Sequence, residues 1–408
     1  MTAPYYADED VTLYLGDCLA VLPGLPDCSV DAIVTDPPYG LEFMGRDWDA
    51  PWQAGVGIGE HNAGFSPGAP AVPGVRGEIK ALPSFTGSTN PTCRNCGGTR
   101  QGNDRRSRRR CRCDRPEFPN TTLPRMHAFQ AWCEQWAAEC LRVLKPGGWL
   151  LAFGGTRTSH RLVCGIEDAG FEIRDSIDWI YGSGFPKNPA CLKPAHEPIV
   201  MARKSSGRSD PLPGLDGCRV QGTPEPTRFD PARHSHDGWR HDTTGAETAA
   251  PAHDAGRWPP NVVLGGEAAA ELDRQSGVSA SKIGKPRQSG YGMTHTGAEY
   301  DDAGGASRFF PVFRYEAKAP ASERPRLPDG TAHPTVKPVD LMAWLVRLVT
   351  PTGGRVLDPF AGSGATAEAC IVEGFRCILI EQDPPSAALI RKRLSKPIQP
   401  VMFGLDAS

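Results

Sequence analysis

The stretch that decides the fold is RVLDPFAGSGATAEACIVEGFRCILIE, at residues 355–381. Its pattern predicts, in order, a buried strand, a glycine-rich turn, a helix and a second buried strand, at 355–358, 360–364, 365–373 and 375–380. Glu381 stands at the carboxyl end of the second strand. A strand, a helix and a strand in this order form one unit of an α/β sheet with parallel strands.

The turn in this unit has the chemistry of a nucleoside site. Gly362 and Gly364 allow a tight turn and a close approach of the backbone to a ligand, and the helix start adds free N–H donors. An acidic residue at the position of Glu381 can bind a pair of ribose hydroxyls. A second GxxG step is missing, so a nucleoside fits better than a dinucleotide pyrophosphate. The alternative is an ordinary tight turn between a strand and a helix.

The same alternation continues in other parts of the chain. Apolar runs predict further strands at 30–35, 149–153, 171–181 and 198–202. Helical patterns lie at 127–144, 158–169, 339–349 and 385–394. We therefore expect a doubly wound, Rossmann-like α/β fold with mostly parallel strands.

The composition limits the class of protein. The 408 residues carry 45 basic and 47 acidic side chains, which excludes a uniformly basic nucleic-acid binder but not a local basic patch. No apolar run reaches the roughly 18 residues of a transmembrane helix, and the acidic start has no signal-peptide core, so we expect a cytoplasmic protein without membrane contact. In the cytoplasm the thirteen cysteines should stay mostly reduced, and clustered ones are metal-ligand candidates.

A second candidate site is Asp36-Pro37-Pro38-Tyr39, directly after the predicted strand 30–35. Ligands of α/β sheets bind at the carboxyl ends of strands. The two prolines fix the backbone, so the Asp36 side chain and the Pro37 carbonyl form converging acceptors for an exocyclic –NH2 group. Tyr39 offers a flat face on which a base can stack. The alternative interpretation is a capped proline turn.

Two stretches, 41–123 and 205–332, are rich in Gly and Pro and poor in aliphatic residues. We interpret the first as an insertion and the second as a loop-rich region. The α/β core then consists of residues 1–40, 124–204 and 333–408.

The insertion contains two close pairs of cysteines, Cys93 with Cys96 and Cys111 with Cys113. Four thiolates in two pairs suit a zinc ion in a zinc-ribbon-like site, and metal binding would explain how a segment without an apolar core folds. The alternative is four unrelated thiols on a loop. Arginines between the pairs form either a solvated surface or contacts to DNA phosphates, and they include Arg105, Arg106, Arg108, Arg109 and Arg110.

Together these segments resemble the DNA amino-methyltransferases that modify adenine N6 or cytosine N4, in the β arrangement that places DPPY before FxGxG. The matching segments are YLGD at 14–17, DPPY at 36–39, LKPGG at 144–148, HPTVKP at 333–338 and LDPFAGSG at 357–364. The segments GSGFPK at 182–187 and KPAHEP at 193–198 resemble bacterial and phage members. The resemblance covers somewhat under half of the chain, and the stretches 41–123 and 205–332 match no general pattern of the family.

The resemblance implies S-adenosylmethionine as the cofactor, with Glu381 on its ribose and Asp17 near its adenine. The full set of implied cofactor-binding residues is Asp17, Thr335, Asp358, Phe360, Gly362, Ser363, Gly364 and Glu381. The implied catalytic residues are Asp36, Pro37, Pro38 and Tyr39, which would hold a base flipped out of double-stranded DNA while the methyl group passes directly to its amino nitrogen. The loop-rich region 205–332 would be the target-recognition region.

The resemblance leaves the base and the partners open. Asp36 favours adenine, because many N4-cytosine enzymes have Ser at that position, so N4-cytosine methylation is the first alternative. An RNA or protein amide methyltransferase is another, although the protein version usually carries Asn in place of Asp36. A zinc-ribbon DNA-binding protein with an inactive core is the non-enzyme alternative, and the intact motifs argue against it. A homodimer and a restriction-enzyme partner are both compatible with the resemblance.

Overall fold

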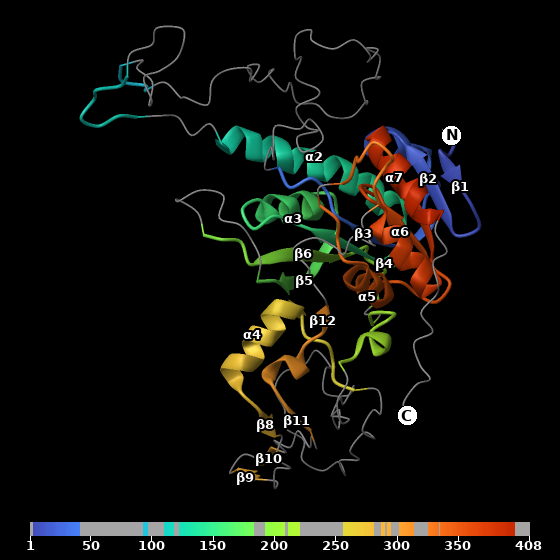
Figure 1. Cartoon of the computed structure of the whole chain (residues 1–408). Helices are drawn as coiled ribbons and strands as arrows, with labels where there is room; N and C mark the ends of the chain where they lie inside the picture. The colour runs from blue at the N-terminus through green and yellow to red at the C-terminus, as the bar shows by residue number, and fades with distance from the viewer. Residues whose placement is uncertain are drawn as a thin grey trace.

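The structure is a computed structural model of the chain, shown in Figure 1. It describes residues 3–40, 93–96, 110–117, 122–182, 192–208, 211–220, 256–280, 287–289, 292–294, 302–313, 325–333 and 335–395. Among the predicted site residues, Arg105, Arg106, Arg108 and Arg109 lie outside these ranges.

Ten strands of the described chain form one sheet, in the order β1-β2-β14-β13-β3-β4-β6-β5-β7-β12. Their bounds, in that order, are Tyr6–Ala7, Val11–Leu15, Arg376–Glu381, Arg355–Asp358, Val30–Thr35, Leu144–Phe153, His196–Arg203, Glu172–Ile180, Val262–Gly265 and Val312–Phe313. Neighbouring strands from β2 to β4 are parallel, whereas β6 runs antiparallel to both β4 and β5. The predicted α/β sheet with mostly parallel strands is therefore confirmed.

Helices cover both faces of this sheet (Figure 1). On one face α1, α2 and α3 contribute to one apolar cluster, and their bounds are Cys18–Val21, Thr122–Val143 and Ser159–Asp168. On the other face α5, α6 and α7 contribute to a second cluster, and their bounds are Val339–Val349, Ala365–Glu373 and Pro384–Leu394. The fold thus has three layers, with the sheet in the middle.

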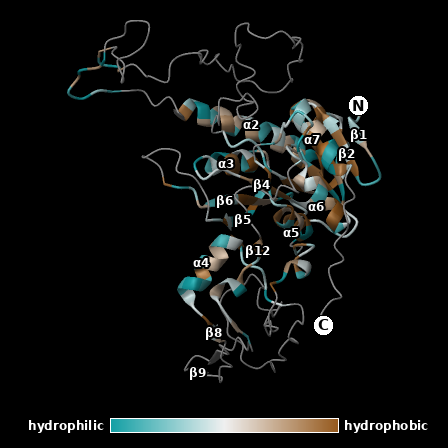
Figure 2. Cartoon of the chain, in the orientation of Figure 1, coloured by the Kyte–Doolittle hydropathy of each residue, from teal (hydrophilic) through white to brown (hydrophobic). Residues whose placement is uncertain are grey.

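The strands at the centre of the sheet are apolar on both faces because helices cover both faces. Along β4, Trp149, Leu151 and Phe153 belong to the cluster with α5, whereas Leu150 and Ala152 belong to the cluster with α2. In Figure 2 the central layers are coloured largely as hydrophobic, and α4 (Gly266–Ser276), outside them, carries mainly hydrophilic colours. Burial of alternate side chains on opposite faces fixes the register of these strands.

Two features differ from the sequence-based expectation. Strand β4 begins at Leu144 rather than Trp149, because Leu144 already pairs with Val30 and a register shift takes up the residues between this pair and the next, Ala32 with Trp149. Strands β7 and β12 come from within residues 205–332, yet both extend the main sheet beyond β5. The predicted target-recognition region is therefore joined to the core through the sheet.

The described residues of this region also contain two small antiparallel pairs of strands, besides α4. Strand β8 (Ser279–Ala280) pairs with β11 (Ala303–Gly304), and β9 (Arg287–Ser289) pairs with β10 (Gly292–Thr294). Among the described residues, we find no helix with the length and apolar character that a membrane crossing requires.

The winding of the sheet changes direction between β13 and β3. From β13 the chain passes through α6 to β14 on one side, and from β3 it passes through α2 to β4 on the other. The carboxyl edge of an α/β sheet at such a point is where ligands bind. Because β13 ends at Asp358 and β3 at Thr35, the two sites predicted from the sequence meet there.

Candidate active site

The turn between β13 and α6 depends on two glycines. Gly362 and Gly364 have φ angles of 54° and 78°, in the left-handed region that glycine adopts without strain. Gly364 is the N-cap residue of α6, and a Cβ on it would lie 3.2 Å from the side chain of Ile390 on α7. A Cβ on Gly362 would lie 3.3 Å from the His333 ring. The sequence therefore uses glycine here both for the backbone turn and for the space beside it.

Asp358 holds this turn from inside the protein. Its carboxylate accepts hydrogen bonds from the Thr35 hydroxyl at 2.6 Å, the Thr366 hydroxyl at 2.5 Å and the Phe360 amide at 3.0 Å. Burial raises the pKa of Asp358 to about 6, against the opposing effect of these donors. The bond from Thr35 joins the end of β3 to the end of β13, across 323 residues of sequence.

Glu381 is positioned by two backbone amides at the end of β14. Its Oε2 accepts from the Gly362 amide at 2.7 Å, and its Oε1 accepts from the Asp383 amide at 2.8 Å. Burial raises the pKa of Glu381 to about 7. Each carboxylate oxygen has a further lone pair, so the side chain can still accept bonds from a pair of hydroxyls. The binding of a ribose by Glu381 stays a prediction.

Asp36 and Tyr39 lie within a cluster of charged and polar groups. The Lys337 ammonium donates to Asp36 Oδ2 at 2.6 Å and lies 3.3 Å from Glu197 Oε2. The Tyr39 hydroxyl lies 2.8 Å from Asp36 Oδ1 and 3.0 Å from Glu197 Oε2, and it accepts from Lys337 at 3.2 Å. We call Asp36, Tyr39, Glu197 and Lys337 the DPPY cluster. It brings together residues from β6, from the turn after β3 and from the segment before α5.

The charges in the DPPY cluster do not balance. Two carboxylates face one ammonium, and the side chain of Lys337 is only 11% exposed. The pKa of Lys337 is raised by Asp36 and Glu197, although burial opposes the shift. Burial and the same two carboxylates raise the pKa of the Tyr39 phenol, so this hydroxyl stays protonated. The cluster therefore carries a net negative charge in a partly buried place.

Groups around the cluster fix its backbone and its aromatic ring. The Thr158 hydroxyl donates to the Tyr39 carbonyl at 2.5 Å, and a Cβ on Gly155 would lie 3.2 Å from the Tyr39 side chain. The Lys337 ammonium also lies 4.7 Å from the centre of the Phe153 ring. These contacts leave the DPPY turn little freedom to move.

The other predicted cofactor residues lie around the glycine turn or the adjacent strand end. Asp17 is exposed after β2, where it caps α1 by accepting from the Leu19 amide at 2.8 Å. Thr335 is exposed, whereas Ser363 is buried. The Phe360 ring packs against Trp132 and Trp136 of α2, with ring centres 5.5 and 5.4 Å apart. The roles of these residues toward a cofactor stay predictions.

Three residues that contact the site were not singled out in the sequence, and a fourth was recognised only as part of a motif. Thr35 and Thr366, which hold Asp358, look like ordinary strand and helix residues. Glu197 lies in the KPAHEP segment, where a signal for it existed but no role was assigned. Lys337 lies in HPTVKP, and the structure places it on Asp36.

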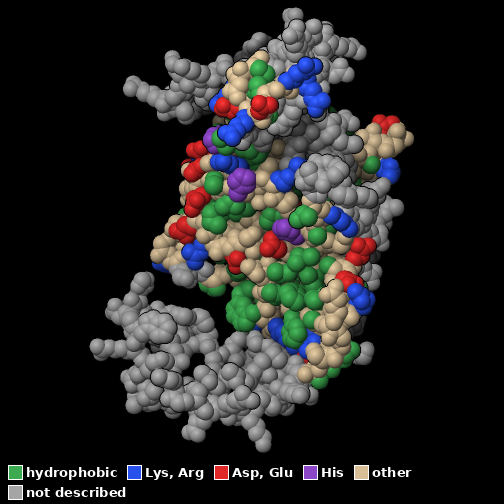
Figure 3. All heavy atoms as spheres, turned by 90° about the vertical axis from the view of Figure 1, so that its left-hand side faces the viewer, with side chains coloured by type: hydrophobic (Ala, Val, Ile, Leu, Met, Phe, Trp, Pro, Cys, Tyr) green, Lys and Arg blue, Asp and Glu red, His purple; other side chains and the backbone are tan. Residues whose placement is uncertain are grey.

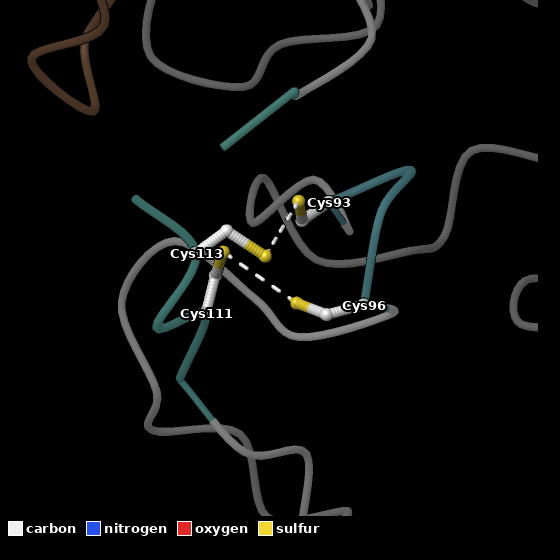
Figure 4. A group of neighbouring side chains, drawn as sticks. All are labelled: Cys93, Cys96, Cys111 and Cys113. Carbon is white, nitrogen blue, oxygen red and sulfur yellow. Dashed lines mark hydrogen bonds between the residues drawn. The ribbon is translucent and has the colours of Figure 1, made fainter. Parts of the chain in front are cut away.

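The four cysteines of the predicted insertion lie together, as Figure 4 shows. All four sulfurs lie within 4.8 Å of one another. Arg110, the one predicted DNA-contact residue in the described part of the chain, is exposed beside this cysteine cluster.

Comparisons with known proteins find a matching family model, a similar methyltransferase and similar solved structures. A protein-family model described as DNA methylase, of the N6 and N4 type, matches residues 30–392. The Type II methyltransferase M.HindIII of Haemophilus influenzae is 24% identical over 357 residues, which cover 87% of this chain and 85% of the relative. Among solved structures, the DNA modification methylase TTHA0409 of Thermus thermophilus has a TM-score of 0.42 at 17% identity, with 95% of each chain covered. The cytosine-N4-specific PvuII DNA methyltransferase has a TM-score of 0.45 at 13% identity, with 96% of this chain and 89% of that one covered.

Proposed function

Because this chain belongs to the N6/N4 DNA methylase family, we propose that it uses S-adenosylmethionine to methylate the N6 amino group of adenine at specific sites in double-stranded DNA. The observation that carries this proposal is the bond from Thr35 to Asp358, which puts the DPPY turn beside the glycine turn. A base amino group and a nucleoside cofactor bound at these two turns would lie at one edge of the sheet.

The residues of the glycine turn fit the cofactor. Gly362 and Gly364 give the turn its left-handed backbone conformation, and the free lone pairs of Glu381 suit the ribose hydroxyls. When bound, S-adenosylmethionine supplies a methyl group made electrophilic by the positive sulfur. Asp358 holds the turn by hydrogen bonds from its buried side, and this role does not require contact with the ligand.

The DPPY cluster fits the amino group of a base. Each oxygen of Asp36 already accepts one bond, from Tyr39 or Lys337, and each has a lone pair left for an amino hydrogen. Bonds from the amino hydrogens to Asp36 and to the Pro37 carbonyl would localise the nitrogen lone pair and turn it toward the methyl group. The Tyr39 ring would stack on the flipped base.

The net charge of the cluster suits the reaction. Positive charge develops on the amino nitrogen during methyl transfer, and preorganised groups that oppose such charge are a main source of catalysis. Asp36 and Glu197 supply that negative potential, while Lys337 and Tyr39 hold the two carboxylates in place. After transfer, the extra proton on the nitrogen can leave through Asp36 to water.

Two further parts of the proposal concern the partners of the enzyme. M.HindIII is a Type II methyltransferase, and this supports a place for the chain in a restriction–modification system. The exposed arginines near the cysteine cluster are suited to DNA phosphates, because phosphate contacts need accessible positive charge.

The proposal is tested by incubating the protein with S-adenosylmethionine and unmethylated genomic DNA, followed by mass spectrometry of the digested nucleosides. We expect N6-methyladenine, and far less of it after the same incubation time with the Asp36→Asn variant. N4-methylcytosine would reverse the choice of base and leave the mechanism in place. Absence of any methylated base, with folded protein that binds the cofactor, would refute the proposal.

A further inference from the structure

We propose that Cys93, Cys96, Cys111 and Cys113 bind one structural zinc ion, separate from the site of methyl transfer. The cluster lies in the connection between β3 and α2, beyond the N-terminal end of α2 in Figure 1. None of its residues contributes to the DPPY cluster or to the glycine turn. The inference therefore does not depend on the proposed function.

The spacing of the sulfur atoms matches a tetrahedral zinc site. Cys93 Sγ lies 4.0 Å from Cys113 Sγ, and Cys96 Sγ lies 3.5 Å from Cys111 Sγ. With Zn–S bonds of about 2.3 Å, the sulfurs of a regular tetrahedron lie about 3.8 Å apart. The two separations fall on either side of this value, and Figure 4 shows the four cysteines as neighbours, with dashed lines from Cys93 to Cys113 and from Cys96 to Cys111.

Disulfide bonds do not explain this arrangement. The sulfurs of a disulfide lie about 2.05 Å apart, far closer than either pair here. The partners also cross between the two short segments, because Cys93 faces Cys113 and Cys96 faces Cys111. A single ion at the centre satisfies all four thiols at once, whereas two disulfides would need both pairs to move together.

The backbone around the cluster is tied together as in a small metal module. The Arg94 amide donates to the Glu117 carbonyl at 2.7 Å, and Asn95 Nδ2 donates to the Arg115 carbonyl at 3.0 Å. The side chains of Arg94 and Glu117 form an ion pair at 3.1 Å. These bonds hold the segment of the first cysteine pair against that of the second. The four candidate ligands therefore come from two chain segments that are bonded to each other beside the cysteines.

Metal binding also explains what stabilises this part of the chain. In the described residues 93–96 and 110–117, Cys93 is the buried residue and the others are half-buried or exposed. Apolar burial therefore contributes little, and bonds to a metal can supply the missing folding free energy. A zinc ion with four thiolates carries a net charge of −2, and four exposed arginines stand next to the cysteines or within two residues of them in the sequence, at 94, 110, 112 and 115. Figure 3 shows basic and acidic side chains side by side at the top of this face.

Metal content of the full-length protein tests the proposal. The protein is purified under reducing conditions without chelator, and its zinc and iron are measured by mass spectrometry. We expect one zinc ion per chain in the wild type and in Cys28→Ser, which removes an exposed cysteine outside the cluster. We expect loss of zinc in Cys111→Ser, and retention in Cys111→His, because imidazole is also a zinc ligand.

Replacement by cobalt gives a second readout that needs no folded variant. Co²⁺ added to metal-free wild-type protein should give the intense visible absorption of a tetrahedral thiolate site, and zinc should displace it. Full zinc in Cys111→Ser, iron in place of zinc, or wild-type protein that neither contains nor takes up zinc or cobalt would each overturn the proposal.

Discussion

At the scale of single residues, Lys337 is the cation that lets the two carboxylates of the DPPY cluster lie close together. Its ammonium contacts Asp36 and Glu197, and both contacts lie in a partly buried place. Buried charges are tolerated when they are paired and hydrogen-bonded, and removing one partner of such a group is costly. The cluster thus links stability and the proposed catalysis in the same four side chains.

Replacing Asp36 by Asn tests the catalytic part of this arrangement. The change keeps the shape of the side chain but removes the charge that opposes the developing positive nitrogen. We expect the rate of methyl transfer to fall about 100- to 1000-fold. The affinity for S-adenosylmethionine, measured by calorimetry, should stay within about twofold, since Asp36 lies outside the glycine turn. A variant with near-wild-type turnover would contradict the proposed role.

Replacing Lys337 by Met tests the structural part. The change leaves two carboxylates without their shared cation, and we expect the free energy of unfolding to fall by up to about 3–5 kcal/mol. The double variant Lys337→Met with Glu197→Gln restores the net charge of −1 that the cluster has in the wild type, and should recover part of this loss. Denaturant unfolding of the wild type, Lys337→Met, Glu197→Gln and the double variant measures the coupling between the two residues. Additive effects would show that Lys337 and Glu197 do not interact.

The raised pKa of Glu381 predicts how cofactor binding depends on pH. Its carboxylate must accept hydroxyl bonds, so a bound ribose favours the ionised form and lowers the pKa from about 7. Affinity should therefore weaken as the pH falls below about 7, by up to about tenfold per pH unit. Calorimetry between about pH 6.5 and 8 stays above the pKa of about 6 at Asp358. Glu381→Gln should bind S-adenosylmethionine more weakly, with an affinity that does not change with pH over this range. An equal pH dependence of the affinity in both proteins would exclude Glu381 as its source.

At the scale of elements, the contact between α2 and α3 places the long helix α2 on the sheet. Gly165 of α3 lies against α2, and a Cβ there would be 2.6 Å from Cys133 Cβ and 2.7 Å from the Gln130 carbonyl. The same helix carries Trp132 and Trp136, which support Phe360 in the glycine turn. The packing of two helices therefore reaches the candidate cofactor site.

Gly165→Ala should force α2 and α3 apart. Backbone atoms cannot yield as a flexible side chain can, so we expect a loss of about 1–3 kcal/mol in the free energy of unfolding. The matched control is Gly266→Ala at the start of α4, where an added Cβ has no neighbour within 4 Å, and it should change stability by less than about 0.5 kcal/mol. Equal stabilities for the two variants would show that the helix contact is looser than described.

At the scale of the whole molecule, the chain must bind a polyanion while its own net charge is −2. DNA affinity then depends on where positive charge gathers rather than on its total. The exposed arginines at 94, 110, 112 and 115 gather in one segment, and Arg94 is the one of them with an ion pair described, to Glu117. This segment is the candidate for the phosphate contacts of the enzyme.

Replacing Arg110, Arg112 and Arg115 together by Ala tests this assignment. Each lost phosphate contact should reduce the slope of log affinity against log salt concentration by about 0.9. The control is Arg376→Ala, because Arg376 begins β14 at the amino edge of the sheet, opposite the candidate site. DNA binding is measured by anisotropy over a salt series. An unchanged slope in the triple variant would make these arginines a solvated surface.

The sequence by itself determined the local elements and the motifs. Strand β3, strand β13, helix α5 and helix α6 have the bounds that the apolar runs and the glycine and proline positions predicted. Patterns of this kind can be found from the sequence because each depends on neighbours a few residues away, through side-chain periodicity and turn conformation. The residues at the centre of both candidate sites were named for the same reason.

The tertiary structure alone decided which side chains meet. The bonds from Lys337 to Asp36, from Tyr39 to Glu197 and from Thr35 to Asp358 span 301, 158 and 323 residues. Such contacts follow from the order and register of strands, which are set by the packing of both faces of the sheet at once and not by any local pattern. For the same reason the sequence could pair the cysteines by spacing, but only the fold could show that each sulfur faces a member of the other pair.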